Sequence, residues 1–497
     1  MHSPSHTRWP ILVWPGLVSL VIALSPAAAW GAVKGLQKEV RVSEPTRLDW
    51  EFVARSFGAG SDKVPKDYDS RKQRYLLYVP NKYKAGKAWP LVVFISPGDE
   101  PLGWRYWEKT CKQLGMFFCA PYGAGNGCPV GKRTRIIMDM LDDVRRHWNI
   151  DADQTYLTGF SGGGRMACTI GFALPEYFGG VIPICGTNPL HPLFYLHHRV
   201  RDRVSVAFVT GTKDFNRKEN EEYMFPWLQQ VKVRCKLWVV PNLGHGIPSS
   251  EVLDEVHAWL AQDTKRRRAD AKALPSLAVL PDKVPTAEEQ SARVLEAAET
   301  VLKKEDLIWQ GVSLLQGIKV RWPKTKAAEK AGKLLEDLLA DPDKAKVIAA
   351  QGAAEQERSL TAQAKGWERL GYPRQAYQFW KMLAQTQPET PAGKKAAREV
   401  KRLRAALAKE PFLGLSFKNE STAINFVYPK GPADKAGLRV DDVVIKMGKK
   451  KIAKPVDLAS ALKEHKPGDK IKLQIRRGGK KRTITVELGS RPEESQK

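Results

Sequence analysis

Residues 155–163 read TYLTGFSGG, and this short stretch decides the fold of the first half of the chain. The run 155–158 is strand-like, and the apolar run 165–173 that follows is helix-like. Glycines on both sides of Ser161 allow the sharp turn that lifts a serine hydroxyl out of a sheet, so a G-x-S-x-G pattern between a strand and a helix predicts a nucleophilic serine. The alternative is a surface turn without chemical importance.

Strand-like and helix-like segments alternate on both sides of this turn, over residues 46–263. Strands alternating with helices imply a mostly parallel sheet with helices on both faces. We therefore predict an α/β domain over 46–263. Its expected helices include 135–148 and 251–262, and its expected strands are 75–79, 91–96, 116–120, 155–158, 180–184, 205–210 and 236–240.

A nucleophilic serine needs a base and an orienting carboxylate, because a free hydroxyl is a poor nucleophile. Asp214 follows the β-run 205–210, and His245 follows the β-run that ends at residue 240, so both stand just beyond a strand and in the order serine, acid, histidine. Asp202 and Glu219 are the alternative acids. His245 has few rivals, because His191, His197 and His198 precede the acid and His257 falls inside the last helix of the domain.

Three segments of this domain resemble secreted α/β-hydrolases of the polyhydroxybutyrate depolymerase and feruloyl esterase type. They are YLLYVP at 75–80, PLVVF at 90–94 and GFSGGGRMA at 159–167. The resemblance implies hydrolysis of carboxylic esters, polymeric esters among them, by Ser161, Asp214 and His245. It also implies no metal and no organic cofactor.

The loop after the strand at 91–96 departs from this family, which usually carries His-Gly there. The present chain reads SPGDE at 96–100. This loop is expected to supply one backbone N–H of the oxyanion hole, the other coming from Gly162. Because proline has no N–H, the loop donor is Gly98 or Asp99. We expect the Asp99 side chain to point away from the hole, since its charge would otherwise oppose the oxyanion.

Residues 264–410 are rich in Ala, Leu, Lys, Glu and Arg and are predicted to be helical, after a proline-spaced linker near 274–285. Ala376, Trp380 and Leu383 have the spacing of the second helix of a tetratricopeptide repeat. Only one such repeat is visible, and a stable solenoid needs about three. A helical spacer between two domains is therefore the favoured interpretation.

Residues 411–490 resemble a PDZ domain of the type found in bacterial envelope proteases. The segment FLGLSF at 412–417 is similar to the carboxylate-binding loop and first groove strand, and GPADKAGLRVDDVV at 431–444 matches the family's most recognisable stretch. The resemblance implies that a peptide or protein C-terminus binds at Leu413, Gly414 and Leu415, beside a helix at 456–464. A PDZ fold kept only for packing or dimerisation is the alternative.

The first residues of the chain predict export. Arg8 precedes an apolar run that is too short to span a membrane, and Ala27-Ala28-Ala29 supplies a cleavage pattern, so residues 1–29 read as a signal peptide. We expect a periplasmic, envelope or extracellular location without a transmembrane helix after cleavage. Oxidation of some of the six cysteines is then possible, although several lie in apolar runs typical of buried thiols.

The composition does not distinguish between functions, so the functional prediction rests on these motifs. The net charge of +27 is spread over all three regions, which argues against a specific nucleic-acid partner. The sequence thus predicts an exported serine esterase with a PDZ module for a protein partner. Two alternatives remain, a non-catalytic envelope scaffold that uses both folds for binding and a serine peptidase.

Overall fold

The computed structural model describes residues 33–58, 68–190, 193–270, 284–418 and 421–490. The predicted signal peptide at 1–29 and most of the predicted linker at 274–285 lie outside these ranges. Within the described ranges, no helix has both the length and the apolar character needed to cross a membrane.

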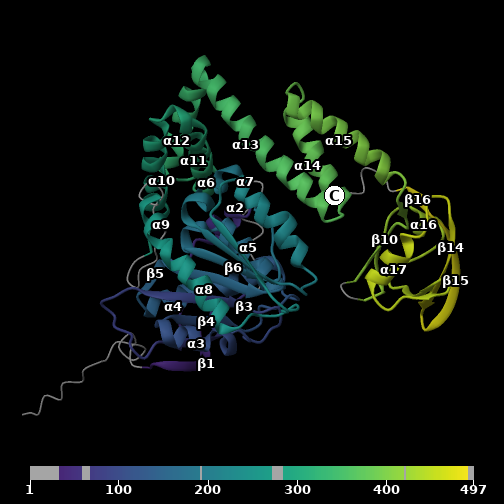
Figure 1. Cartoon of the computed structure of the whole chain (residues 1–497), viewed down its shortest axis with the longest axis horizontal. Helices are drawn as coiled ribbons and strands as arrows, with labels where there is room; N and C mark the ends of the chain where they lie inside the picture. The colour runs from purple at the N-terminus through teal and green to yellow at the C-terminus, as the bar shows by residue number, and fades with distance from the viewer. Residues whose placement is uncertain (1–32, 59–67, 191–192, 271–283, 419–420, 491–497) are drawn as a thin grey trace, which may run out of the picture.

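The first half of the chain forms one eight-stranded sheet in the order β1-β2-β4-β3-β5-β6-β7-β8 (Figure 1). The strand β2 is antiparallel to both of its neighbours, and the pairs from β3–β4 to β7–β8 are parallel. This order, with a tight turn after the central strand β5, is that of an α/β-hydrolase. The strands are β1 (Gly35–Arg41), β2 (Arg74–Val79), β3 (Trp89–Ile95), β4 (Phe117–Pro121), β5 (Ile150–Phe160), β6 (Gly180–Ile184), β7 (Ser205–Gly211) and β8 (Cys235–Val240).

Helices cover both faces of this sheet, as predicted. Trp107 of α3 and Val256 of α8 belong to the apolar core on one face, and Leu141 of α4 and Ile170 of α5 belong to the core on the other. The bounds are α2 (Trp50–Ser56), α3 (Trp104–Leu114), α4 (Val130–His147), α5 (Gly162–Ala173), α6 (Phe194–Arg203), α7 (Phe225–Gln230), α8 (Ser250–Gln262) and α9 (Thr264–Asp270).

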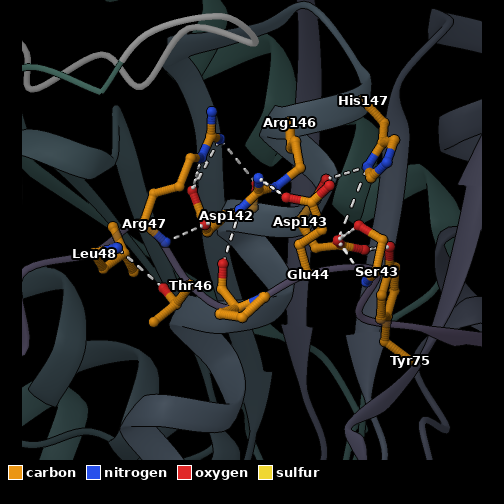
Figure 2. A network of polar contacts seen from close by, with 11 residues as sticks. Ser43, Glu44, Thr46, Arg47, Leu48, Tyr75, Asp142, Asp143, Arg146 and His147 are labelled. Carbon is orange, nitrogen blue, oxygen red and sulfur yellow. Dashed lines mark hydrogen bonds and ion pairs between the residues drawn. The ribbon is translucent and has the colours of Figure 1, made fainter. Parts of the chain in front are cut away.

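An acidic pair on α4 fastens the segment that precedes α2 (Figure 2). Asp142 accepts the backbone N–H of Arg47 at 2.9 Å and pairs with its guanidinium at 2.9 Å. Asp143 accepts the hydroxyls of Ser43 at 2.7 Å and Tyr75 at 2.6 Å. Both carboxylates are buried, so these bonds satisfy charges that would otherwise be costly to desolvate.

The helical region is present, and its first helices pack directly on the hydrolase domain. Val301 of α10 and Leu315 of α11 lie in the same apolar core as β3 and α4 of the hydrolase. Arg321 at the end of α11 donates to buried Glu176 at 3.0 Å, and Arg199 of α6 pairs with the same carboxylate at 2.7 Å. This part of the region therefore extends the hydrolase core, in addition to separating two domains. The helices are α10 (Ala287–Leu302), α11 (Ile308–Arg321), α12 (Lys326–Ala340) and α13 (Pro342–Arg369).

Two further helices, α14 (Pro373–Thr386) and α15 (Pro391–Leu407), pack on the end of α13 and lead to the C-terminal module (Figure 1). Ala376, Trp380 and Leu383 are all buried in the core that these three helices share. The spacing noticed in the sequence is thus that of a buried helix face.

The C-terminal module is β-rich and has its own apolar core, which includes Leu413, Ile424, Val444, Leu473 and Ile475. A four-stranded sheet in the order β13-β12-β14-β15 lies beside the two-stranded pair β10–β11 and the pair β16–β9. The bounds are β9 (Pro411–Phe412), β10 (Leu415–Phe417), β11 (Ile424–Val427), α16 (Pro432–Lys435), β12 (Val443–Met447), β13 (Lys450–Lys451), α17 (Pro455–Leu462), β14 (Lys470–Arg477), β15 (Lys480–Glu487) and β16 (Gly489–Ser490).

Candidate active site

Ser161 lies at the turn between β5 and α5. Its backbone conformation is one that residues other than glycine seldom adopt. Its φ is 55° and its ψ is −119°, and its N–H donates to the carbonyl of Ile184 at 2.8 Å. A Cβ at Gly163 would lie 1.9 Å from the carbonyl oxygen of Ile95. Only glycine fits at position 163, because the end of β3 lies against the turn there. Ser161 is half-buried.

The three residues singled out in the sequence form one chain of hydrogen bonds. His245 Nε2 lies 2.9 Å from Ser161 Oγ, and His245 Nδ1 lies 2.8 Å from Asp214 Oδ1. A carboxylate only accepts hydrogen bonds, so the neutral imidazole carries its proton on Nδ1 and leaves Nε2 to accept from the serine hydroxyl. This is the geometry in which an imidazole removes the proton of an attacking serine.

Asp214 is held by more than the histidine. Thr210 Oγ1 donates to its Oδ2 at 2.7 Å, and the backbone N–H of Asn216 donates to its Oδ1 at 3.1 Å. Burial alone would raise the pKa of Asp214, but these bonds and the one from His245 outweigh it and hold the pKa below its usual value. The sequence reasoning did not identify Thr210, whose position at the end of β7 is the signal that was available.

The alternative acids lie elsewhere. Glu219 pairs with Arg165 at 2.6 Å, and Asp202 accepts a hydrogen bond from Gln310 at 3.3 Å. Of the acids weighed in the sequence, Asp214 is therefore the one that the structure brings to the imidazole.

The buried thiol of Cys185 lies next to Asp214. Cys185 is fully buried, adopts a φ of 55°, and donates its S–H to the carbonyl of Gly246 at 3.3 Å. In the described part of the chain, Cys185, Asp214 and His245 form the one group of His, Cys, Asp or Glu side chains close enough to hold a metal. Burial, followed by the charge of Asp214, raises the pKa of this thiol to about 12, so the free thiol stays protonated.

All six cysteines are free thiols, and Cys111, Cys119, Cys168 and Cys185 are buried. The oxidation considered in the sequence analysis is not present in this structure. Burial also raises the pKa of Cys168 to about 11, which keeps that thiol unreactive.

Two aromatic rings flank the imidazole. The ring of Phe215 stacks on His245 with centroids 4.1 Å apart, and Phe160 lies on it at 4.9 Å. Phe215 is 75% exposed, which is unusual for a side chain of this size. The sequence analysis missed Phe215, although it directly follows Asp214.

The loop expected to complete the oxyanion hole follows β3. Asp99 Oδ1 accepts the backbone N–H of Gly125 at 3.0 Å, and the carbonyl of Asp99 accepts the N–H of Gly123 at 2.8 Å. The carboxylate is therefore bonded to the loop between β4 and α4. Gly98 is exposed, and Gly162 is the first residue of α5, where a backbone N–H has no partner within the helix.

The C-terminal module presents a second candidate site. Within the described residues, β10 pairs only with β11, so its other edge is open beside α17. Gly414 has a φ of 80° at the start of this edge. A cleft of about 870 Å³ runs along it, lined by apolar side chains of β10 and α17 together with Tyr372 and Arg374 at the start of α14.

The comparison with protein families matches this module. A PDZ-domain model matches residues 411–488. A "Probable periplasmic serine endoprotease DegP-like" from Ectopseudomonas mendocina (strain ymp) is 39% identical over 70 residues, which are 14% of this chain and 15% of that protein. One with the same title from Bartonella henselae is 40% identical over 65 residues, 13% of each chain. The chain thus carries a C-terminal PDZ domain and spans about one seventh of these relatives.

Solved structures of several hydrolases are similar to part of the chain. The S-formylglutathione hydrolase FrmB from Staphylococcus aureus has a TM-score of 0.32 at 14% identity, over 39% of this chain and 94% of its own. Est1E from Butyrivibrio proteoclasticus has a TM-score of 0.31 at 16% identity, over 40% and 97%. At these scores, the fold assignment rests on the strand order of the present chain.

Proposed function

We propose that this protein is a serine esterase, in which Ser161 attacks the carbonyl carbon of a carboxylic ester. His245 takes the serine proton and returns it to the departing alcohol, and Asp214 orients the imidazole and stabilises its cation. The observation that carries the proposal is the chain of hydrogen bonds at 2.9 Å and 2.8 Å that joins the three side chains.

The access to Ser161 fits an ester that arrives from solvent. The serine is half-buried, and the exposed ring of Phe215 offers an apolar surface beside the base. An acyl or alcohol group with apolar surface would gain free energy by covering that ring. Polymeric esters remain among the candidate substrates.

The test compares wild type with Ser161→Ala on short p-nitrophenyl esters. We expect ester turnover in the wild type and its complete loss in Ser161→Ala, with an unchanged urea midpoint, because the variant loses the nucleophile and little packing. The control is Ser421→Ala, which alters an exposed serine of the PDZ domain and should leave turnover unchanged. Equal turnover in wild type and Ser161→Ala would reject the proposal.

Two outcomes of the same assay would favour the other functions considered. Cleavage of peptide p-nitroanilides faster than esters would indicate a serine peptidase. A wild type that neither hydrolyses esters nor reacts with a fluorophosphonate probe at Ser161 would indicate a non-catalytic scaffold.

We propose further that the PDZ domain binds the C-terminus of a peptide or protein. The support is the open edge of β10, the loop Leu413-Gly414-Leu415 at its start, and the cleft of about 870 Å³ beside α17. Backbone N–H groups of such a loop capture a terminal carboxylate, and the peptide adds a strand to the open edge.

The matched ligands for this second test are one peptide with a free C-terminus and the same peptide with an amidated one. Fluorescence anisotropy should give binding that weakens by at least about tenfold on amidation, a difference of about 1.4 kcal/mol. A chain that ends at Glu410 serves as the control without a PDZ domain. Equal binding of the two peptides would reject a carboxylate-binding role.

Export is the remaining part of the proposal. The signal-peptide pattern at 1–29 supports it, and so does the similarity of the PDZ part to relatives whose titles call them periplasmic. Cell fractionation of the full chain, together with the N-terminal sequence of the mature protein, tests it. Cleavage after Ala29 is the expected result.

A further inference from the structure

A buried arginine lies between the two loops that meet at the nucleophile. Arg133 of α4 is 5% exposed. Its Nη2 donates to the carbonyl of Ser96 at 2.8 Å, and its Nη1 donates to Asn126 Oδ1 at 3.2 Å. One guanidinium thus holds both the loop after β3, which begins at Ser96, and the loop between β4 and α4.

The bond to Arg133 fixes which way the Asn126 amide faces. A guanidinium has donors and no acceptors, so the oxygen of the amide must face it and the NH₂ group must face away. The backbone N–H of Asn126 also donates to the carbonyl of Pro97 at 2.8 Å, which ties the residue to the loop after β3. Among the described residues, no acceptor bonds Asn126 Nδ2, and the side chain is exposed.

This amide lies against the residue that follows the nucleophile. A Cβ built on Gly162 would be 2.0 Å from Asn126 Oδ1 and 2.6 Å from Nδ2. Glycine at position 162 therefore makes room for the amide. The Asn126 amide thus packs against Gly162, the residue that follows Ser161 and carries the other expected oxyanion donor.

Resting on the esterase function proposed above, we propose that Asn126 is a catalytic residue. Its NH₂ group donates a hydrogen bond to the oxyanion, next to the N–H of Gly162, and Arg133 is the positioning residue that aims it. This inference adds a side-chain donor to a hole whose loop carries Pro97, which has no N–H to offer.

Asn126 acts while the ester acylates Ser161. Ser161 Oγ forms a bond to the carbonyl carbon, the second C–O bond of the carbonyl opens, and its electron pair moves to the oxygen while the serine proton passes to His245 Nε2. Asn126 donates to that oxygen while it carries the charge. The electron pair then returns to re-form the carbonyl, the bond to the alkoxide breaks, and the alkoxide leaves with the proton from His245.

The alternative is that Asn126 only tethers Arg133, and Asn126→Asp separates the two roles. A carboxylate at position 126 keeps or strengthens the bond to the guanidinium, so a tether would survive. The same change removes the NH₂ donor and places a negative charge beside the oxyanion, so catalysis would fall.

The experiment measures kcat and KM for p-nitrophenyl acetate in the full chain. Loss of one oxyanion donor lowers kcat by about 10²- to 10³-fold where water is excluded from the hole. We expect Asn126→Ala to lower kcat by about 10- to 100-fold, because this amide is exposed to water. KM should change less than about threefold, and Asn126→Asp should be no faster than Asn126→Ala. The control is Asn149→Ala, at the opposite end of β5, which loses a bond to Ala85 and should keep wild-type kcat.

A kcat within about twofold of wild type for Asn126→Ala, or wild-type kcat for Asn126→Asp, would overturn the inference while leaving the esterase function intact. An inactive wild type whose Ser161 fails to react with a fluorophosphonate would overturn both together. The fluorophosphonate reaction therefore distinguishes a wrong role for Asn126 from a wrong esterase function.

The positioning role of Arg133 is tested with Arg133→Lys in two backgrounds. If Arg133 acts through Asn126, the substitution lowers kcat several-fold in the wild type and clearly less in Asn126→Ala, because coupled residues are not additive. Equal falls in both backgrounds would reject that role. Urea unfolding of each variant shows whether a fall in kcat arises from lower stability of the folded chain.

Discussion

The ring of Phe215 stacks on the imidazole of His245, with centroids 4.1 Å apart and planes inclined by 27°. An exposed phenylalanine gains little by burial in the folded chain, so its stabilising contact is with the proposed base. The ring limits the rotamers of His245 and shields one face of the imidazole from water.

We predict that Phe215→Ala lowers kcat/KM for p-nitrophenyl butyrate by about 2- to 13-fold, because a ring pair contributes about 0.5–1.5 kcal/mol. Phe215→Tyr keeps the ring and should retain most of the activity. If Phe215→Ala matches wild type in steady-state kinetics, the stacking has no part in positioning the base.

We predict a larger effect at Asp214, the acid of the proposed triad. Asp214→Asn should lower kcat by about three to four orders of magnitude, because an amide neither holds the Nδ1–H tautomer nor stabilises the imidazolium. Asp202→Asn is the matched control, since Asp202 contacts Gln310 of α11 and should leave kcat unchanged. A larger loss in the control than in Asp214→Asn would show that the acid is misassigned.

The sequence singled out the three residues of the proposed triad because each follows a strand with a local signature. Ser161, Asp214 and His245 follow β5, β7 and β8, and parallel strands bring their carboxyl ends to one edge. No local pattern predicts the contact between Asn126 and Gly162. The same is true of the contact between Arg321 and Glu176, which are 145 residues apart, because packing between distant segments makes both pairs. For the same reason, the sequence does not predict that α10 and α11 pack into the hydrolase core. An amphipathic pattern identifies a helix but not the surface that it packs against.

The buried cluster of Glu176, Arg199 and Arg321 should make stability depend on acid pH. Burial alone would raise the pKa of Glu176, but the two guanidinium groups outweigh it and lower the pKa from 4.5 to about 2. A lowered folded-state pKa gives stability that is present above pH 4.5 and is lost as the pH falls toward 2.

We therefore expect Glu176→Gln to lower the free energy of unfolding at pH 7 by about 3–5 kcal/mol, because it removes the buried carboxylate that pairs with both Arg199 and Arg321. The difference from wild type, measured by urea unfolding, should shrink as the pH falls below 4.5. A difference that stays constant with pH would contradict the assignment of the ionised carboxylate.

Truncation distinguishes the two parts of the helical region. A chain that ends after Glu410 keeps α10–α15 and should retain wild-type kcat on esters. A chain that ends after Asp270 exposes the apolar surface that Val301, Leu315 and Ile318 cover, and each such side chain contributes about 1.5–3 kcal/mol on burial. We expect this shorter chain to aggregate or unfold at lower urea concentration. Equal stability of the two truncated chains would show that α10 and α11 are dispensable.

The last prediction concerns the loop after β3. The carboxylate of Asp99 accepts the N–H of Gly125 at 3.0 Å, and the side-chain oxygen of an asparagine accepts the same bond. Asp99→Asn should therefore change kcat by less than about tenfold, a shift below about 1.4 kcal/mol in the barrier. Asp99→Ala loses the bond and should be slower than Asp99→Asn, because the loop that carries Asn126 loses one of its ties to the loop carrying Gly98. A large rise in kcat for Asp99→Asn would mean that the native charge suppresses catalysis, and the scaffold function would then be favoured.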